Sequence, residues 1–450
     1  MKHLINYCIA LSSIIGFLTT FLSIVLLVLF LNLFVENNIV QSLPTKQCNI
    51  EICDQPIVKD QNLKVELVSD ELTAPTNMAF LDNNDALILE RYGGKVVRMI
   101  NDTIQSEPLL EVNVSNGPER GLLGITVSKQ ESKSGDGQTL YVFLYYTETE
   151  SKGGDVLGNR LYRYELVGNK LINPKLLLNL PTTPGPNHNG GSIAIGPDNN
   201  VYLTIGDLDN ATGKPHVNTI IQNVKSGEAP NGSGGILRIS QDGDVVAGDI
   251  IGNTYPLNLY YGYGIRNSFG IGFDPITGKL WDTENGPNYG DEINLVEPGF
   301  NSGWKKVQGI WQLRGSNIGK ELDDNPEGLV NFGGKGKYSL PEFIWKGRYG
   351  PTALKFLDSN KLGKKYENDL FIGDVHNGNI YHFELNKDRT AFALAGLLSD
   401  KIANNTEELN DIIFAKGFGN ITDIEVGGEG YLYILSYVHR SSYRIVPIGS

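Results

Sequence analysis

Three short stretches of the sequence hold side chains of the types that carry out chemistry. His188 stands in PNHNGG, Pro186 to Gly191, and is one of only six histidines. Its side chain changes charge nearest neutral pH and can act as a general base; a loop histidine bonded only to turn backbone is the structural alternative. Arg266 and Asn267 stand side by side in YGIRNSFG. A planar cationic donor beside an amide could stabilise developing negative charge, although an arginine that braces neighbouring loops would have the same local sequence.

The third stretch, Asp282 to Asn294, is dense in carboxylates, amides and loop carbonyls. Ca²⁺ takes about six to eight oxygen ligands of these kinds, so the stretch is a candidate calcium site. Its spacing is not that of an EF-hand loop, and an Asx-rich turn has a similar composition. The sequence has no His/Cys set with zinc spacing, no Walker loop and no G-x-S-x-G elbow. These absences disfavour hydrolysis by a serine triad.

Short strands must position these stretches, because the chain after residue 60 alternates apolar and polar residues between Gly, Asn and Asp turns. One unit recurs six times, and its copies begin at Asn77, Gly121, Ser192, Phe269, Thr352 and Ile421. Such repeats predict an all-β fold, a six-bladed β-propeller over residues 62–450. The inner strands of a propeller converge on a central channel, so polar residues beside these strands are expected at one mouth.

The N-terminal segment differs from the rest of the chain. Residues 4–35 carry no charge, and the run exceeds the ~20 apolar residues that cross a bilayer. We expect a transmembrane helix as a membrane anchor over residues 1–36, with the propeller outside the cytoplasm by the positive-inside rule; a cleaved signal peptide is the alternative. Residues 37–61 are expected to form a stalk, in which Cys48 and Cys53 either pair or remain free thiols.

The charge balance restricts the partners. The formal net charge is −13, the sequence pI is near 5.0, and no basic run occurs. Nucleic-acid phosphates are bound through clustered Lys and Arg, so the sequence argues against a nucleic-acid partner.

Taken together, five segments resemble the soluble glucose and aldose sugar dehydrogenases that depend on pyrroloquinoline quinone (PQQ). They are ERGLLGI, NHNGG, YGIRNSFG, TENGPNYGDEINLVEPGFNSGW and ITDIEVGGEGYLYILS. The resemblance implies six blades and oxidation of an aldose to its lactone, with an external electron acceptor that reoxidises the cofactor. It also implies that His188 is the general base and that Arg266 and Asn267 contact the quinone carbonyls.

The same resemblance implies a metal set. The carbonyls of Gly286 and Pro287 match ligands of the Ca²⁺ that bridges to PQQ. Glu292 and the carbonyl of Ser302 fall where some members hold a structural Ca²⁺.

The remaining cofactor contacts depart from the family pattern. Glu119, His376 and Thr422 match cofactor-binding positions, yet the family has glutamine at the first, lysine at the second and arginine near the third. The usual cations for the PQQ carboxylates are therefore missing. Three other cations, Arg120, Lys214 and Arg348, are candidates to replace them.

Two further hypotheses stand beside the sugar dehydrogenase, and the first comes from another resemblance. The ERGLLG and GFG-x-IT-D segments also resemble the propellers of Hedgehog-interacting-protein-like chains. This resemblance implies a non-catalytic, calcium-stabilised propeller that binds a glycan or a protein partner. A propeller lactonase is disfavoured, because its metal site usually draws carboxylates from several blades.

Overall fold

Strands with apolar residues on both faces build the molecule. The computed structural model describes residues 55–131, 138–209, 218–314, 317–322 and 326–449. In β9 (Gln138–Thr149), Val142 and Leu144 pack with the first sheet of the chain, whereas Phe143 and Tyr145 pack with the third. Successive side chains of a strand point to opposite faces, so one strand contributes to two layers of core. The apolar core therefore lies between neighbouring sheets.

Six sheets follow one another in chain order, and their strands have these bounds. The first sheet holds β3 (Pro75–Asp82), β4 (Asp85–Glu90), β5 (Lys95–Ile100), β6 (Thr103–Ile104) and β7 (Leu110–Glu111). The second holds β8 (Leu122–Glu131), β9, β10 (Val156–Val167) and β11 (Lys170–Leu180). The third holds β12 (Ile193–Ile195), β13 (Val201–Ile205), β14 (Gly235–Ile239), β15 (Tyr260–Tyr263), β19 (Phe300–Asn301) and β23 (Lys337–Tyr338).

The other three sheets follow the same plan. The fourth holds β16 (Ser268–Phe273), β17 (Leu280–Glu284), β18 (Asp291–Val296), β24 (Phe343–Trp345) and β28 (Ile402–Ala403). The fifth holds β25 (Pro351–Phe356), β26 (Leu370–Asp374), β27 (Ile380–Phe383), β29 (Ile413–Lys416) and β1 (Ile57–Val58). The sixth holds β30 (Ile421–Val426), β31 (Leu432–Ser436), β32 (Ser441–Pro447) and β2 (Leu63–Ser69). A small extra sheet holds β20 (Val307–Gln308), β21 (Trp311–Arg314) and β22 (Asn317–Glu321).

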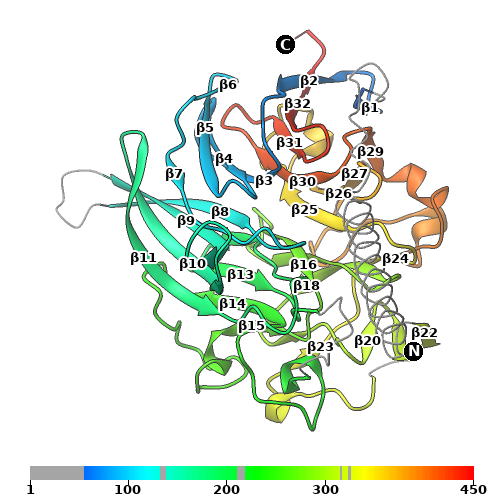
Figure 1. Cartoon of the computed structure of the whole chain (residues 1–450). Helices are drawn as coiled ribbons and strands as arrows, with labels where there is room; N and C mark the ends of the chain where they lie inside the picture. The colour runs from blue at the N-terminus through cyan, green and yellow to red at the C-terminus, as the bar shows by residue number, and fades with distance from the viewer. Residues whose placement is uncertain (1–54, 132–137, 210–217, 315–316, 323–325, 450) are drawn as a thin grey trace, which may run out of the picture. The chain divides into compact units, whose positions relative to one another are not determined.

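The first strands of the six sheets close into a ring. Each of β3, β8, β12, β16, β25 and β30 contacts the next, and β30 contacts β3. The ring is fastened by β2, which pairs antiparallel with β32 from the other end of the chain, so that blue lies beside red in Figure 1. The all-β prediction is confirmed, and six sheets in a closed ring agree with a six-bladed β-propeller.

The predicted inner strands match the first strands of the sheets. Each begins within two residues of the predicted start, from Pro75 for Asn77 to Ile421 itself. The loops that enter these strands therefore meet at one end of the ring. This end positions the candidate site.

The N-terminal predictions fall mostly outside the described residues. The anchor at residues 1–36, Cys48 and Cys53 all lie there. Of the described residues, none belongs to a helix that is both long and apolar enough to cross a membrane. The compact unit begins at Gln55 rather than at residue 62, because β1, in the predicted stalk, pairs with β29.

Candidate functional site

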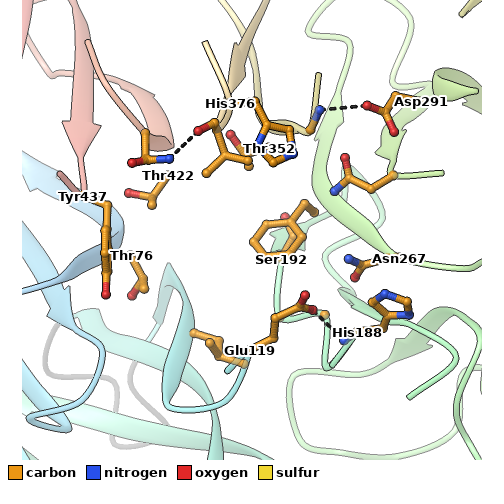
Figure 2. Close-up of a pocket in the computed structure, with 18 of the residues that line it drawn as sticks. Thr76, Glu119, His188, Ser192, Asn267, Asp291, Thr352, His376, Thr422 and Tyr437 are labelled. Atoms are coloured by element: carbon orange, nitrogen blue, oxygen red, sulfur yellow. Dashed lines mark hydrogen bonds between the residues drawn. The ribbon is translucent and has the colours of Figure 1, made fainter. Parts of the chain in front are cut away.

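A cavity of about 400 Å³ lies where the inner strands begin. It gathers eight of the ten residues predicted from the sequence, namely Glu119, His188, Arg266, Asn267, Gly286, Pro287, His376 and Thr422. Figure 2 shows His188 and Asn267 on one side of this cavity, with Thr76 and Tyr437 on the opposite side. Glu292 and Ser302 are not among the lining residues.

One close approach of the backbone places His188 beside Arg266. His188 has a φ of 58°, a left-handed conformation that residues other than glycine adopt infrequently. Its carbonyl accepts a hydrogen bond of 3.1 Å from the amide of Gly206. A Cβ at Gly206 would lie 2.6 Å from that oxygen and 2.5 Å from the carbonyl oxygen of Arg266. The chain after β13 can pass between the two residues because Gly206 has no side chain.

Behind His188 lies a carboxylate that the sequence analysis missed. Oδ1 of Asp207 lies 2.6 Å from Nδ1 of His188, and Oδ2 accepts a hydrogen bond of 2.7 Å from the indole Nε1 of Trp304. Burial opposes ionisation of Asp207. The hydrogen bond with His188 and the nearby positive charges outweigh it, however, and hold the pKa of Asp207 below its usual value. The ionised carboxylate accepts the proton of Nδ1, which leaves Nε2 of His188 free to accept another.

Glu119 contacts the same loop from the other side. Its Oε2 accepts a hydrogen bond of 2.5 Å from the backbone amide of His188, which is dashed in Figure 2. The carboxylate thus lines the cavity while it holds the backbone of the predicted base. Contact between Glu119 and a cofactor stays a prediction.

Arg266 is fixed at both its backbone and its side chain. Its amide donates to Oε1 of the buried Glu284 at 2.7 Å. Its Nη1 donates to the carbonyls of Asn285 and Gly286 at 2.7 and 3.0 Å. The guanidinium lies 5.5 Å from the ring centroid of Trp304, within cation–π distance. A positive charge held in this way needs little reorganisation to stabilise an anion.

Two amide oxygens at the cavity lack partners. Within the part of the chain that the structure describes, Oδ1 of Asn267 and Oδ1 of Asn285 are both buried and accept no hydrogen bond. An unsatisfied buried acceptor costs about 1–3 kcal/mol, so such atoms point to a missing donor or cation. Both residues line the cavity beside Arg266. Two unsatisfied acceptors therefore lie beneath this wall, beside the cationic donor Arg266.

Gly286 and Pro287 also line this wall. Asp291 shapes their loop, because its Oδ1 accepts from the amide of Gly286 at 2.8 Å and its Oδ2 accepts from the amides of Tyr349 and Gly350 at 2.7 and 2.8 Å. One carboxylate thus joins two loops of the cavity. The chemistry of the loop carbonyls suits Ca²⁺.

Glu292 and Ser302 lie in a buried layer instead. The hydroxyl of Ser302 is 2.6 Å from Oε2 of Glu284 and 3.0 Å from Oε1 of Glu292. A hydroxyl has one proton, so both contacts are hydrogen bonds only when one carboxyl is protonated. Burial raises the pKa of Glu292 to about 8 and that of Asp282 to about 7.

Glu292 is turned away from the cavity because it follows Asp291 in β18, where neighbours face opposite sides. Among the described residues, no group of three or more His, Cys, Asp or Glu side chains is arranged to hold a metal ion. A structural Ca²⁺ at Glu292 and Ser302 stays a prediction.

The side of the cavity around His376 and Thr422 is neutral. Burial lowers the pKa of His376, and the charge of Arg348 lowers it further. Thr422 donates to the carbonyl of Pro75 at 3.1 Å. Of the three candidate cations, Arg348 lines the cavity, whereas Arg120 donates to the carbonyls of Thr182 and Gly185. Lys214 lies outside the described residues.

Known proteins share this sequence pattern and fold. The aldose sugar dehydrogenase YliI of Escherichia coli (strain K12) is 26% identical over 388 residues, which cover 83% of this chain and 90% of that protein. Quinoprotein glucose dehydrogenase B of Acinetobacter calcoaceticus is 28% identical over 322 residues, which cover 66% of this chain and 65% of that protein. The PQQ-bound structure of the aldose sugar dehydrogenase of Streptomyces coelicolor superposes with a TM-score of 0.59 at 22% identity, over 87% of this chain and all of that one.

The family model described as Glucose / Sorbosone dehydrogenase matches residues 72–442. This span covers most of the chain and every residue of the cavity wall. The predicted resemblance to sugar dehydrogenases is thus confirmed, and the chain belongs to the glucose/sorbosone dehydrogenase family.

Proposed function

We propose that the protein oxidises an aldose at its anomeric carbon to the lactone, with PQQ and Ca²⁺ as cofactors. The observation that carries the proposal is that His188, with the ionised Asp207 behind it, shares a cavity of about 400 Å³ with Arg266. Cavities of roughly 300–1,000 Å³ are typical of small-molecule sites. Family membership supports the class of reaction, as do the sugar-dehydrogenase names of the relatives.

His188 and Asp207 have different roles in this reaction. The anomeric hydroxyl gives its proton to Nε2 of His188 while the C1–H bond breaks and the carbonyl of the lactone forms. Asp207 stabilises the imidazolium through Nδ1, so the base does not turn during proton transfer. When bound, PQQ would supply the acceptor for the C1 hydrogen and its electron pair, transferred together as hydride, and an external electron acceptor would then reoxidise it.

The wall beside Arg266 suits these cofactors. Gly286 and Pro287 would hold Ca²⁺ through their carbonyls, and Arg266 and Asn267 would contact the quinone oxygens. Glu119, His376 and Thr422 would lie against the rest of the cofactor.

The test is a titration of the purified protein with PQQ in the presence of Ca²⁺, followed by dye reduction with a panel of aldoses. His188→Ala should lower kcat by about 10²- to 10⁴-fold, the usual contribution of a general base. Equal activity in this variant would remove His188 from the mechanism. Absence of both PQQ binding and sugar-dependent dye reduction would refute the proposed enzymatic function. It would favour a non-catalytic propeller that binds a glycan or protein partner.

We also propose that residues 1–36 anchor the protein in a membrane, with the sugar site outside the cytoplasm. Support comes from the uncharged run at residues 4–35. Fractionation of cells that express the full chain, or a chain without residues 1–36, tests this directly. Equal amounts of both chains in the soluble fraction would refute the anchor.

A further inference from the structure

Three arginines line the cavity, and two of them are already engaged. Arg91 donates from Nε to the carbonyl of Arg120 at 2.9 Å and from Nη2 to the carbonyl of Pro118. Arg266 donates to the carbonyls of Asn285 and Gly286, as described above. Arg348 differs, because none of the described residues gives its guanidinium an ion pair or a hydrogen bond.

The backbone beside Arg348 is held firmly, although the side chain is exposed. Arg348 stands between β24 and β25, and the amides of the next two residues, Tyr349 and Gly350, both donate to Oδ2 of Asp291. The same carboxylate holds the amide of Gly286. The position of Arg348 is thus tied to the loop that carries the predicted Ca²⁺ ligands.

Arg348 also stands beside the neutral side of the cavity. A Cβ at Gly350, two residues along the chain, would lie 2.9 Å from Cδ2 of His376. His376 is disfavoured as a cation, because burial and the charge of Arg348 both lower its pKa. Nearby Asn420 donates its amide to the carbonyl of Val375, and Thr422 donates to that of Pro75. Among the described residues, His376, Asn420 and Thr422 give this part of the wall no charged donor, and Arg348 is an adjacent cation.

We propose that Arg348 binds a carboxylate of the ligand held in this cavity. A guanidinium offers a planar pair of donors that matches a carboxylate, and a free one at a cavity rim keeps its full capacity to do so. The inference rests on the proposed function, which puts two carboxylate sources at the site. One is the tricarboxylate cofactor, PQQ, and the other is a uronic acid, an aldose that carries its own carboxylate.

The experiment compares Arg348→Gln and Arg348→Lys with the wild-type protein, using PQQ, glucose and glucuronate as probes. Lys346→Gln is the matched control, because Lys346 is an exposed cation of the same loop that does not line the cavity. The readouts are the Kd for PQQ from an equilibrium titration without sugar, and kcat/KM for each sugar at saturating PQQ.

Loss of one charge-assisted hydrogen bond should change the affected constant by about 10- to 100-fold. If the carboxylate is that of the cofactor, Arg348→Gln raises the Kd for PQQ by this factor. The ratio of kcat/KM for glucuronate to kcat/KM for glucose then stays unchanged. If it is that of the sugar, the Kd for PQQ stays constant and kcat/KM for glucuronate falls while that for glucose is retained. In either case Arg348→Lys restores part of the loss, and either pattern supports the proposal.

A change of less than about twofold in every constant would overturn it, as would an equal effect of Lys346→Gln. Failure of the proposed function is distinguishable, because it appears in the wild-type protein itself as neither PQQ binding nor sugar-dependent reduction. That result would remove both inferences. A functional wild-type protein with an unaffected Arg348→Gln variant would remove this one alone.

Discussion

Replacing Asp207 by asparagine removes one charge from the site and almost no volume. In the native protein both carboxylate oxygens accept, one from Nδ1 of His188 at 2.6 Å and the other from Trp304 at 2.7 Å. An asparagine has a single acceptor oxygen, so an amide oxygen kept on Trp304 turns the NH₂ group toward His188. Nδ1 must then accept, and the proton moves to Nε2. The nitrogen that should receive the sugar proton is thereby occupied.

The expected size of the effect follows from these contacts. The hydrogen bond between His188 and the charged Asp207 contributes about 1.5–3 kcal/mol. Its loss alone should therefore lower kcat by at least about 10-fold. Loss of the correct tautomer adds most of the contribution of a general base, so the expected fall is about 10²- to 10⁴-fold. Asp207 does not line the cavity, so KM for the sugar and Kd for PQQ should change by less than about threefold.

The assay is steady-state dye reduction at saturating PQQ and Ca²⁺, with the Kd for PQQ measured separately. Trp304→Phe is the control, because it removes one hydrogen bond from Asp207 but keeps the carboxylate on His188 and an aromatic ring under Arg266. It should cost about 10-fold in kcat. The reasoning is refuted if Asp207→Asn lowers kcat less than Trp304→Phe does, or if its loss appears in KM or in cofactor affinity.

Two further predictions concern the scaffold. Gly206→Ala should lower kcat by about 100-fold, because its Cβ would lie 2.5 Å from the carbonyl oxygen of Arg266 and 2.6 Å from that of His188 and would force the two residues apart. Gly93→Ala is the control and should keep the wild-type kcat, because its Cβ would have contacts no closer than 3.6 Å. Equal kcat values for the two variants would contradict the argument. Burial raises the pKa of Asp282 to about 7, so its stabilising effect is present at low pH and is lost as pH rises toward 7. Between pH 5 and pH 8, the free energy of unfolding of the wild type, measured with urea, should fall by about 3 kcal/mol relative to that of Asp282→Asn. Parallel plots of unfolding free energy against pH for the two proteins would count against a buried neutral carboxyl group.

Local patterns were sufficient to predict the strands and the centre of the site. The first strands begin within two residues of the predicted positions, because period-two alternation and turn residues are local properties. His188, Arg266 and Asn267 converge as predicted because each precedes or opens an inner strand. In a closed ring those entry points must meet.

Contacts between elements were not predictable in the same way. Asp207 reaches His188 only because the loop before β12 folds back along the end of β13, and no spacing rule marks a pair 19 residues apart. Asp291 joins Gly286 to Gly350, although Asp291 and Gly350 are 59 residues apart in the sequence. Glu292 was predicted, with Ser302, at a structural Ca²⁺ separate from the ion of Gly286 and Pro287, and that site stays a prediction. The side chain that contacts the loop of Gly286 is its neighbour Asp291, and the strand pleat turns Glu292 into the buried layer.

The site shows how surroundings decide what a carboxyl group does. Asp207 and Asp282 are both almost completely buried, and burial alone would make both neutral. Asp207 stays ionised because His188 and Trp304 donate to it and because the charges of Arg266 and Lys305 lie near. Burial raises the pKa of Asp282 to about 7, because the groups that favour its ionised form, Asn294 and Ser268, are neutral. The negative charge of Asp207 therefore lies directly behind the base, where it stabilises the imidazolium, while the positive charge of Arg266 lies on the cavity wall.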